Sequence, residues 1–352
     1  MHVGYEASFQ SDGHLPDDEF VRRAMDYCLR AESLGFDSIW LTEHHFSDYG
    51  LIGDPLQALS YLAGRTERVR LGTAVLVLPW HDPVRVAEQV LLADHLSGGR
   101  IVPGIGRGLS KSEYEGMRVP IEQSRAIFQE HAELLLGALE DGMVAGGERI
   151  AQPARELRPR PLKSFRGRVL SASVSPASAP LMAKLGVGLM FVIVKPVELM
   201  RVDLENYRTA WREEHGADDV PPQPTLSAVV VVDESADRAH HVAMKYERSS
   251  HRIAVDHYGM ADPDFGDVPG YEYYRRMRTT TAPVVTNPPA TVIHGTPQQV
   301  LERLYEYKRH LDMQALLTIF HGLPFEDGER SLRCFVDRCL PELRSWPAQP
   351  TF

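Results

Sequence analysis

Several features that would assign this sequence to a class of proteins are scarce or missing. Its 352 residues include only three cysteines, Cys28, Cys334 and Cys339, whose number and spacing suit neither a disulfide framework nor a zinc site. No apolar run is long enough to span a bilayer, and the N-terminal MHVGYEASF lacks the basic region of a signal peptide. The net charge of −10 argues against nucleic acid or an anionic membrane surface as a partner. We therefore expect a soluble, cytoplasmic enzyme without a metal site.

Short catalytic motifs are missing as well. The sequence contains no H-E-x-x-H helix, no phosphate-binding P-loop, no G-x-S-x-G elbow and no basic–aromatic patch. No dinucleotide-binding fingerprint follows the first predicted strand. Hydrophobic residues nevertheless make up 43% of the chain, which is enough to bury a large core.

The sequence does contain a regular alternation of apolar strands and amphipathic helices. The predicted strands are Val3–Phe9, the apolar run inside Gly35–Phe46, Val69–Leu78, Arg100–Ile105, Val169–Ser173, Leu189–Val194, Thr225–Val232 and Ala315–Phe320. The predicted helices are Asp17–Leu34, Pro55–Gly64, Pro83–Leu96, Ile121–Leu139, Ala177–Leu185, Val197–Glu214, Ala236–His251, one that starts at a Thr296–Gln299 capping box, and Glu329–Cys339. Eight strands, each followed by a helix, predict a (β/α)8 TIM barrel, with a doubly wound open sheet as the alternative.

Two stretches of the chain lack this periodicity. A Pro- and Arg-rich segment that continues to Phe165 separates strands four and five. The block Asp256–Val292, after strand seven and its helix, is rich in Gly, Pro and Thr. Loops of this length inside a compact domain are usually lids or binding loops, so we predict a mobile lid there. No convincing linker occurs, and residues 1–352 are predicted to form a single domain.

The stretch Gly35–Phe46, which reads GFDSIWLTEHHF, is the strongest candidate for a catalytic site. Its apolar run ends in Glu43, His44 and His45, and parallel α/β sheets carry their chemistry at the carboxyl ends of strands. The alternative is that Glu43 and His45 only form hydrogen bonds at the rim of the sheet.

Two other stretches could bind an anion. GIGRG, at Gly104–Gly108, follows strand four, where glycine lets backbone amides approach an anion and Arg107 supplies hydrogen-bond donors. SASVSPAS, at Ser171–Ser178, joins strand five to a helix whose free amides could bind the same anion. Arg125 could reach this place from the preceding helix. The alternatives are a tight turn with a solvated arginine and ordinary helix capping by serine.

Small residues in the third strand could admit a flat ligand. LGTAVLVLP, at Leu71–Pro79, has Gly72, Thr73 and Ala74 where such a ligand could lie against the backbone. The alternative is a buried central strand. In the helix that follows, Glu88 interrupts an apolar pattern, which suits either a helix–helix interface or a stripe facing solvent.

Taken together, these stretches resemble the bacterial luciferase-like flavin monooxygenases, most closely the branch of the luciferase α-subunit. The resemblance lies in IWLTEHHFSDYGLIGDP, RLGTAVLVLPWHDPVRVAEQV, LSGGRIVPGIGRGL and the SRA of Ser124–Ala126. It continues more weakly through SASVSPAS, AKLGVG and HGTPQQV. Each motif alone is modest, whereas their common order and spacing over nearly the whole chain are specific.

The resemblance implies a TIM barrel with a mobile loop after strand seven. It implies reduced FMN as a dissociable cosubstrate, delivered by a separate NAD(P)H:flavin reductase, and a flavin C4a-hydroperoxide formed with O2. His44 would be the catalytic acid/base. The residues that would hold the FMN phosphate are Arg107, Arg125, Ser175 and Ser178.

The resemblance also implies contacts to the flavin ring and between subunits. Ala74 and Val75 would lie under the isoalloxazine, across a non-prolyl cis bond, and Gly106 and Val174 would lie beside it. The helices around residues 54–65 and 83–96, including Glu88, would form a homodimer interface.

Two departures from the family's pattern bear on the reaction. Gly106 stands where luciferase α-subunits commonly carry cysteine, which is expected to open space beside the flavin. Val174 stands where luciferases have an acidic residue. We therefore predict a monooxygenase that does not emit light, acting by Baeyer–Villiger-type attack or hydroxylation on a small organic substrate. The alternatives are an F420-dependent reductase or dehydrogenase of the same superfamily and a non-catalytic flavin-binding subunit.

Overall fold

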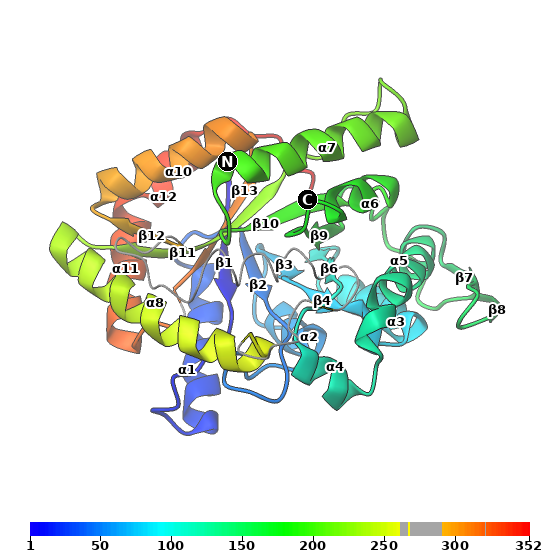
Figure 1. The fold of residues 1–352 in the computed structure, drawn as a ribbon, viewed down its shortest axis with the longest axis horizontal. Helices are drawn as coiled ribbons and strands as arrows, with labels where there is room; N and C mark the ends of the chain where they lie inside the picture. Colours follow the sequence, from blue (N-terminus) through cyan, green and yellow to red (C-terminus); the bar gives the residue numbers. More distant parts are fainter. Residues whose placement is uncertain (261–266, 268–290, 321) are drawn as a thin grey trace.

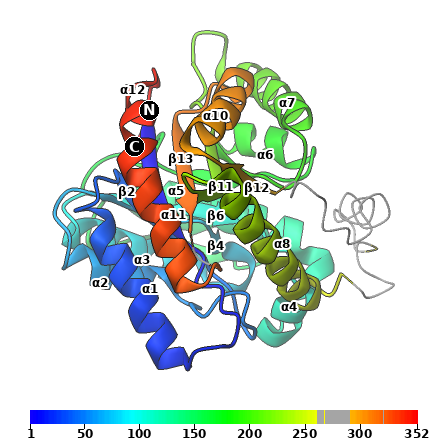
Figure 2. The ribbon, with the colours of Figure 1, turned by 90° about the vertical axis from the view of Figure 1, so that its left-hand side faces the viewer.

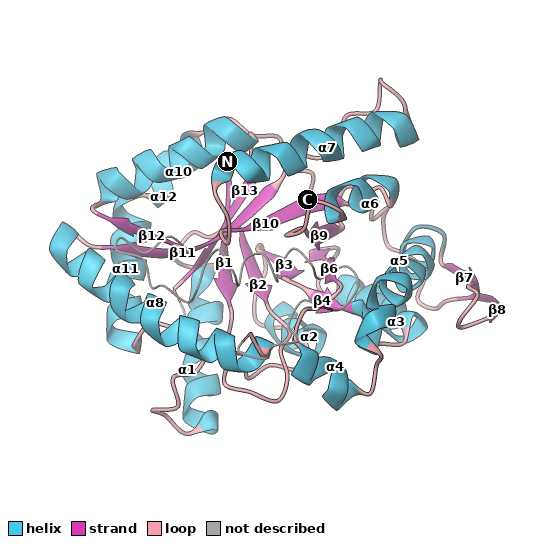
Figure 3. Ribbon diagram, viewed as in Figure 1, coloured by secondary structure: helices cyan, strands magenta, loops and turns pink. Residues whose placement is uncertain are grey.

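Parallel strands lie at the centre of the protein (Figure 3), and their pairing arranges them in a ring. The computed structural model describes residues 1–260, 267, 291–320 and 322–352. The strands of the ring are β1 (His2–Ala7), β2 (Ser38–Leu41), β3 (Arg70–Thr73) with β4 (Leu76–Val77), β5 (Ile101–Val102) with β6 (Gly104–Gly106), β9 (Leu170–Ala172), β10 (Gly188–Val192), β11 (Thr225–Val232) and β13 (Ala315–Ile319). The pairing runs from β4 through β6, β9, β10, β11, β13, β1, β2 and β3 to β5. Because β4 continues β3 and β6 continues β5, the pairings β3–β5 and β4–β6 close the ring, and the predicted TIM barrel is confirmed.

Helices surround the ring (Figures 1 and 2). They are α1 (Asp17–Ala31), α2 (Pro55–Ala63), α3 (Pro83–Leu96), α4 (Lys111–Met117), α5 (Ser124–Asp141), α6 (Ser178–Lys184), α7 (Val197–His215), α8 (Ala236–Tyr258), α10 (Pro297–Leu311), α11 (Phe325–Arg338) and α12 (Leu340–Ser345), with 3-10 turns at Leu78–Trp80 and Ile121–Gln123. The predicted capping box of α10 is present. None of the helices in the described part of the chain is long and apolar enough to cross a membrane.

The structure corrects the two stretches that were predicted to be irregular. The segment before Phe165 contains an antiparallel hairpin, β7 (Met143–Gly146) and β8 (Gln152–Glu156), at the edge of the molecule (Figure 1). Its strands are mostly exposed, so they lack the apolar alternation that reveals a half-buried strand.

The predicted lid, Asp256–Val292, begins and ends in regular structure. Helix α8 continues to Tyr258, beyond its predicted end at His251, and Gly259 ends it in a left-handed conformation. An additional strand, β12 (Val292–Gly295), pairs in parallel with the second half of β11. Most of the predicted lid lies outside the described residues.

Trp40 fills part of the interior of the barrel. Its indole packs with Val102, Leu170, Met190 and Leu317. A Cβ added to Gly72, on the neighbouring strand β3, would overlap with the indole ring. The expectation that Gly72 leaves its backbone open to a flat ligand is therefore wrong, because Trp40 occupies the space.

We expect Gly72→Ala to destabilise the protein because its methyl group would displace Trp40. Overpacking of this kind typically costs about 1–3 kcal/mol of the free energy of unfolding. The measurement is the midpoint of urea denaturation, followed by circular dichroism.

Gly137→Ala is the matched control. Gly137 lies within α5, and an added Cβ there meets no atom within 4 Å. Alanine should stabilise the helix by up to about 1 kcal/mol. Equal denaturation midpoints for wild type and Gly72→Ala would contradict the account of Trp40.

Candidate active site

The residues singled out from the sequence follow the carboxyl ends of strands. Glu43, His44 and His45 follow β2, Arg107 follows β6, and Ser173 follows β9. All of these strands are parallel members of one ring, so their carboxyl ends open at the same mouth of the barrel.

Glu43 is a buried carboxylate with four hydrogen-bond donors around it. Its oxygens accept from Trp80 Nε1 at 2.6 Å and the Val77 amide at 2.9 Å. The Nε2 atoms of His81 and His45 lie 2.7 and 3.1 Å away. Burial raises the pKa of Glu43, but the hydrogen bonds from the two histidines outweigh it, and the pKa falls below its usual value. Glu43 and His45 thus form hydrogen bonds at the rim of the sheet, as the alternative weighed from the sequence expects.

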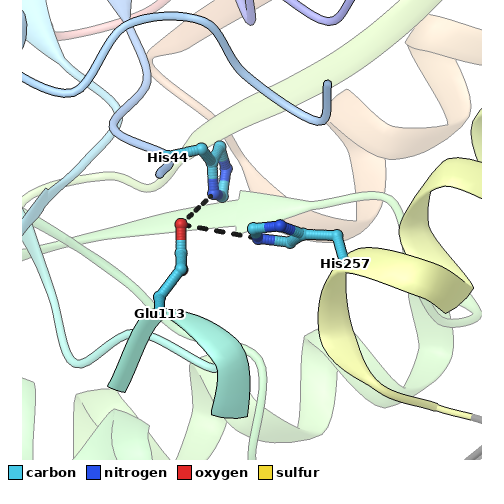
Figure 4. A group of neighbouring side chains, drawn as sticks. All are labelled: His44, Glu113 and His257. Carbon is cyan, nitrogen blue, oxygen red and sulfur yellow. Dashed lines mark hydrogen bonds and ion pairs between the residues drawn. The ribbon is translucent and has the colours of Figure 1, made fainter. Parts of the chain in front are cut away.

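His44 has a different partner, the carboxylate of Glu113 on α4 (Figure 4). Oε1 of Glu113 lies 3.3 Å from His44 Nδ1 and 3.5 Å from His257 Nε2, and it accepts the His45 amide at 2.7 Å. The side chains of Glu113 and His257 are buried, whereas that of His44 is 18% exposed. His44 is thus the member of this cluster that reaches open space.

The protonation of the cluster follows from these contacts. Burial alone raises the pKa of Glu113, but the attraction of the nearby His257 and His44 imidazoles outweighs it and lowers the pKa to about 2. Burial lowers the pKa of His44 because the imidazolium is disfavoured, and the attraction of Glu113 only partly restores it. At neutral pH the structure therefore places an uncharged His44 beside an ionised carboxylate.

His257 is held in place by the loop after β2 and by α4. Its Nδ1 lies 2.6 Å from Ser47 Oγ, and its carbonyl oxygen accepts from Ser110 Oγ at 2.8 Å and Ser112 Oγ at 3.1 Å. Its ring stacks on Tyr49 at 4.7 Å between centroids. The last turn of α8 is thereby fixed beside α4, as Figure 2 shows.

Glu113 and His257 were not found from the sequence. Helix α4 is short and follows the GIGRG turn, and no apolar periodicity marks it. A usable signal was present, because Ser110 stands three residues before Glu113 and its side chain caps the Glu113 amide. His257 lies in the part of α8 that was assigned to the irregular block.

The residues predicted to lie under a flavin ring are close together. The peptide bond between Ala74 and Val75 is cis, as the resemblance implied, and both residues are half-buried at the edge of the Trp40 cluster. A Cβ added to Gly106 would overlap with the Val75 side chain. The space left by Gly106 is therefore filled by Val75, contrary to the expectation that it stays open.

The predicted phosphate ligands come from three parts of the chain: Arg107 follows β6, Arg125 lies in α5, and the two serines lie at the start of α6. The hydroxyls of Ser175 and Ser178 lie 2.7 Å apart at the start of α6, and neither caps that helix. The predicted capping by serine is therefore wrong. Arg125 lies half-buried in the first turn of α5 and makes no hydrogen bond or ion pair within the described residues. No hydrogen bond in the described part of the chain joins Arg125 to either serine, so their convergence on one phosphate stays a prediction.

Other polar groups near the end of β9 could receive a bound molecule. The hydroxyls of Ser171 and Ser173 are buried and have no hydrogen-bond partner among the described residues. The Val174 carbonyl accepts from Lys195 Nζ at 2.7 Å, and Lys195 is also paired with Asp203. Buried hydroxyls without a protein partner could be satisfied by a polar edge of a bound ligand.

Glu6 is a further buried carboxyl that the sequence did not identify. It lies near the carboxyl end of β1, and its one hydrogen bond within the described residues is from Ser227 at 2.6 Å. Burial raises the pKa of Glu6 to about 7, although Ser227 partly offsets the effect. The signal in the sequence that could have identified Glu6 is a glutamate within an apolar strand pattern.

Comparison with known proteins assigns the chain to a family. A sequence profile described as luciferase-like monooxygenase matches residues 1–312. The alkanal monooxygenase alpha chain of Aliivibrio fischeri is 27% identical over 328 residues, which cover 90% of this chain and 91% of that protein. The corresponding chain of Photorhabdus luminescens is 30% identical over 233 residues, which cover 65% of this chain and 63% of that protein.

Solved structures share the fold. Monooxygenase RslO1 from Streptomyces bottropensis has a TM-score of 0.80 at 22% identity, covering 97% of this chain and 100% of that one. The oxygenating constituent of 3,6-diketocamphane monooxygenase from Pseudomonas putida, in complex with FMN, has a TM-score of 0.74 at 14% identity, covering 99% and 100%. The coenzyme F420 dependent tetrahydromethanopterin reductase from Methanopyrus kandleri has a TM-score of 0.70 at 16% identity, covering 97% and 99%. Since the family profile spans most of the sequence, this chain belongs to the luciferase-like monooxygenase family.

Proposed function

We propose that the protein is a cytoplasmic flavin-dependent monooxygenase that uses reduced FMN and O2 to oxygenate a small organic substrate. A separate NAD(P)H:flavin reductase would supply reduced FMN as a dissociable cosubstrate. The reaction would be Baeyer–Villiger-type attack on a carbonyl compound or hydroxylation. The observation that carries this proposal is the contact, at 3.3 Å, between Nδ1 of the partly exposed His44 and the buried carboxylate of Glu113 at the mouth of the barrel.

Glu113 would act on the reaction by orienting His44. A carboxylate accepts hydrogen bonds only, so the contact with Nδ1 favours the His44 tautomer that carries its proton there. The Nε2 atom is then left with a lone pair that can take a proton and return it. His44 is the proposed catalytic residue, and Glu113 is a positioning residue.

The other predicted residues would hold the flavin. Reduced FMN, when bound, supplies the electrons that activate dioxygen. Ala74, Val75, Gly106 and the Val174 backbone would face its ring, and the half-buried apolar surface there would help to exclude water. The residues that would bind its phosphate are Arg107, Arg125, Ser175 and Ser178.

An F420-dependent reductase or dehydrogenase is the second candidate. The fold shared with the F420 dependent reductase from Methanopyrus kandleri favours it. A non-catalytic flavin-binding subunit is a third candidate, but the buried cluster around His44 argues against it, since burying an ionised carboxylate is costly unless its partners are retained.

The first experiment is stopped-flow mixing of protein and reduced FMN with oxygenated buffer. We expect the wild type to change the rate of flavin reoxidation relative to free reduced FMN, because binding removes the flavin from bulk water. In His44→Ala the reoxidation rate should shift by about a hundredfold or more, the usual size of a general acid–base contribution. Substitution of the exposed His241 on α8 by alanine is the control and should leave the rate unchanged.

Two results would count against the monooxygenase. One is reoxidation at the rate of free flavin together with tight binding of F420, which would establish the reductase candidate. The other is binding of reduced FMN with identical reoxidation in wild type and His44→Ala, which would favour the non-catalytic subunit.

The phosphate site can be tested by comparing FMN with riboflavin, which lacks the phosphate. We expect Arg125→Leu to weaken FMN binding by about tenfold, because a charge-assisted hydrogen bond contributes roughly 1.5–3 kcal/mol, and to leave riboflavin binding unchanged. Arg201→Leu, at an exposed arginine of α7, is the control. Equal losses for the two flavins would remove Arg125 from the phosphate site.

We also propose that the protein forms a homodimer through α2 and α3. Three large apolar side chains on these helices are exposed by half or more, namely Tyr61, Leu92 and Leu96. Glu88 lies on α3 and is paired with Arg85.

Sedimentation velocity tests this interface. Leu92→Arg should raise the dimer dissociation constant by about tenfold or more, because a charge would replace a buried apolar anchor. Leu199→Arg, at a similarly exposed leucine of α7, should leave the constant unchanged. A monomeric wild type, or equal effects of both substitutions, would contradict the proposed interface.

A further inference from the structure

The cluster around Glu113 has a geometry that hydrogen bonding alone does not explain. His44 Nδ1, Glu113 Oε1 and His257 Nε2 lie within 4.8 Å of one another, on three different parts of the chain (Figure 4). Glu113 Oε1 is 3.3 Å from the first nitrogen and 3.5 Å from the second. Charge-assisted N–H···O bonds are shorter, at about 2.7–2.9 Å. The buried Nε2 of His257 makes no hydrogen bond within the described residues.

These separations are close to those between the ligands of a metal ion. Ligand atoms at about 2.1 Å from a tetrahedral zinc ion lie roughly 3.4 Å from one another. Two imidazoles and one carboxylate are a common protein donor set for zinc, with a fourth position open to water. His44 is the partly exposed member of the group, so it offers that open side.

We propose that His44, Glu113 and His257 form a binding site for one divalent transition-metal ion of the zinc type. The spacing of these residues along the chain matches no metal-binding motif, which is why no metal site is expected from the sequence. The ion would join the loop after β2, helix α4 and the last turn of α8.

Groups behind the three ligands already orient them. Ser47 Oγ engages Nδ1 of His257 at 2.6 Å, which leaves Nε2 as the ligand atom. The His45 amide donates to Glu113 Oε1 at 2.7 Å and fixes the carboxylate. Such outer contacts fix the ring orientation of metal-binding histidines, and their loss typically costs about 10–100-fold in metal affinity.

Occupancy of this site would have a consequence for the reaction. The ion would take the Nδ1 atom of His44, so His44 could no longer keep a proton there and would be a poorer acid/base. Metal binding should therefore inhibit the enzyme. This consequence rests on the proposed function, whereas the binding itself does not.

Two further groups of side chains among the described residues could bind metal and must be removed from the test. Glu198, Glu306 and His310 form a more exposed group. His240 Nδ1 and His294 Nε2 lie 3.2 Å apart. The double variant His240→Gln/His310→Gln leaves the proposed site intact and serves as the background.

The experiment is a titration of the untagged, flavin-free protein with Co²⁺, followed by visible absorption, with Zn²⁺ competition. In the background variant we expect a single Co²⁺ with the bands of a four-coordinate ion, displaced by one Zn²⁺. Adding His257→Gln or Glu113→Gln should weaken Co²⁺ binding by about a hundredfold, and Ser47→Ala, which removes no ligand, by about tenfold.

The outcomes separate the proposal from its rivals. Equal Co²⁺ affinity in the background and in His257→Gln or Glu113→Gln, or no visible bands with the background protein, would overturn it. Circular dichroism checks that the variants fold. If His257→Gln and Glu113→Gln do not fold, the Ser47→Ala variant decides. A Co²⁺ affinity equal to that of the background variant would then overturn the proposed site. Metal binding without any effect on flavin reoxidation would instead count against the proposed role of His44.

Discussion

The charge of Glu113 is the constraint on which the mouth of this barrel depends. An ionised carboxylate taken out of water is costly unless hydrogen bonds and charge partners surround it. Its partners here are His44 and the His45 amide from the loop after β2, and His257 from the end of α8. Satisfying one buried charge therefore fixes three segments relative to one another, and His44 inherits its orientation from that arrangement.

Three glutamates that are buried in the described part of the chain illustrate how surroundings set the behaviour of one residue type. Glu43 has four donors and a lowered pKa, so it stays ionised and holds the turn after β4 against the loop after β2. Glu113 is ionised as well, but one of its partners, His44, reaches the open mouth. Within the described residues the Glu6 carboxyl accepts a hydrogen bond from Ser227 alone, and burial raises its pKa to about 7. The number of hydrogen-bond donors around each carboxylate decides whether it stays ionised or can change its protonation state near neutral pH.

Sequence patterns predicted the barrel well because its strands and helices are strongly periodic, and helix α3 has the predicted bounds. These patterns did not predict elements that lack a regular spacing of apolar residues. The exposed hairpin β7–β8 has no buried face, and α4 is only seven residues long. Gly72 shows a different limit of sequence-based prediction. Its lack of a side chain leaves room for Trp40 on a neighbouring strand, and this contact is visible only in three dimensions. The pairing of His44 with Glu113 was missed for the same reason, although the Ser110–Glu113 cap signalled the helix that carries it.

The anchoring of His257 also bears on how the molecule assembles. The hydrogen bond between Ser47 and His257 joins residues 210 positions apart, and that between His44 and Glu113 spans 69. Contacts of such long range form only after the entropy of closing the intervening chain has been overcome. During synthesis the first half of the chain can pair its strands while Glu113 still lacks its most distant partner. The mouth of the barrel is thus completed by a residue from the last third of the sequence, and a chain that ends before α8 would carry His44 without its full surroundings.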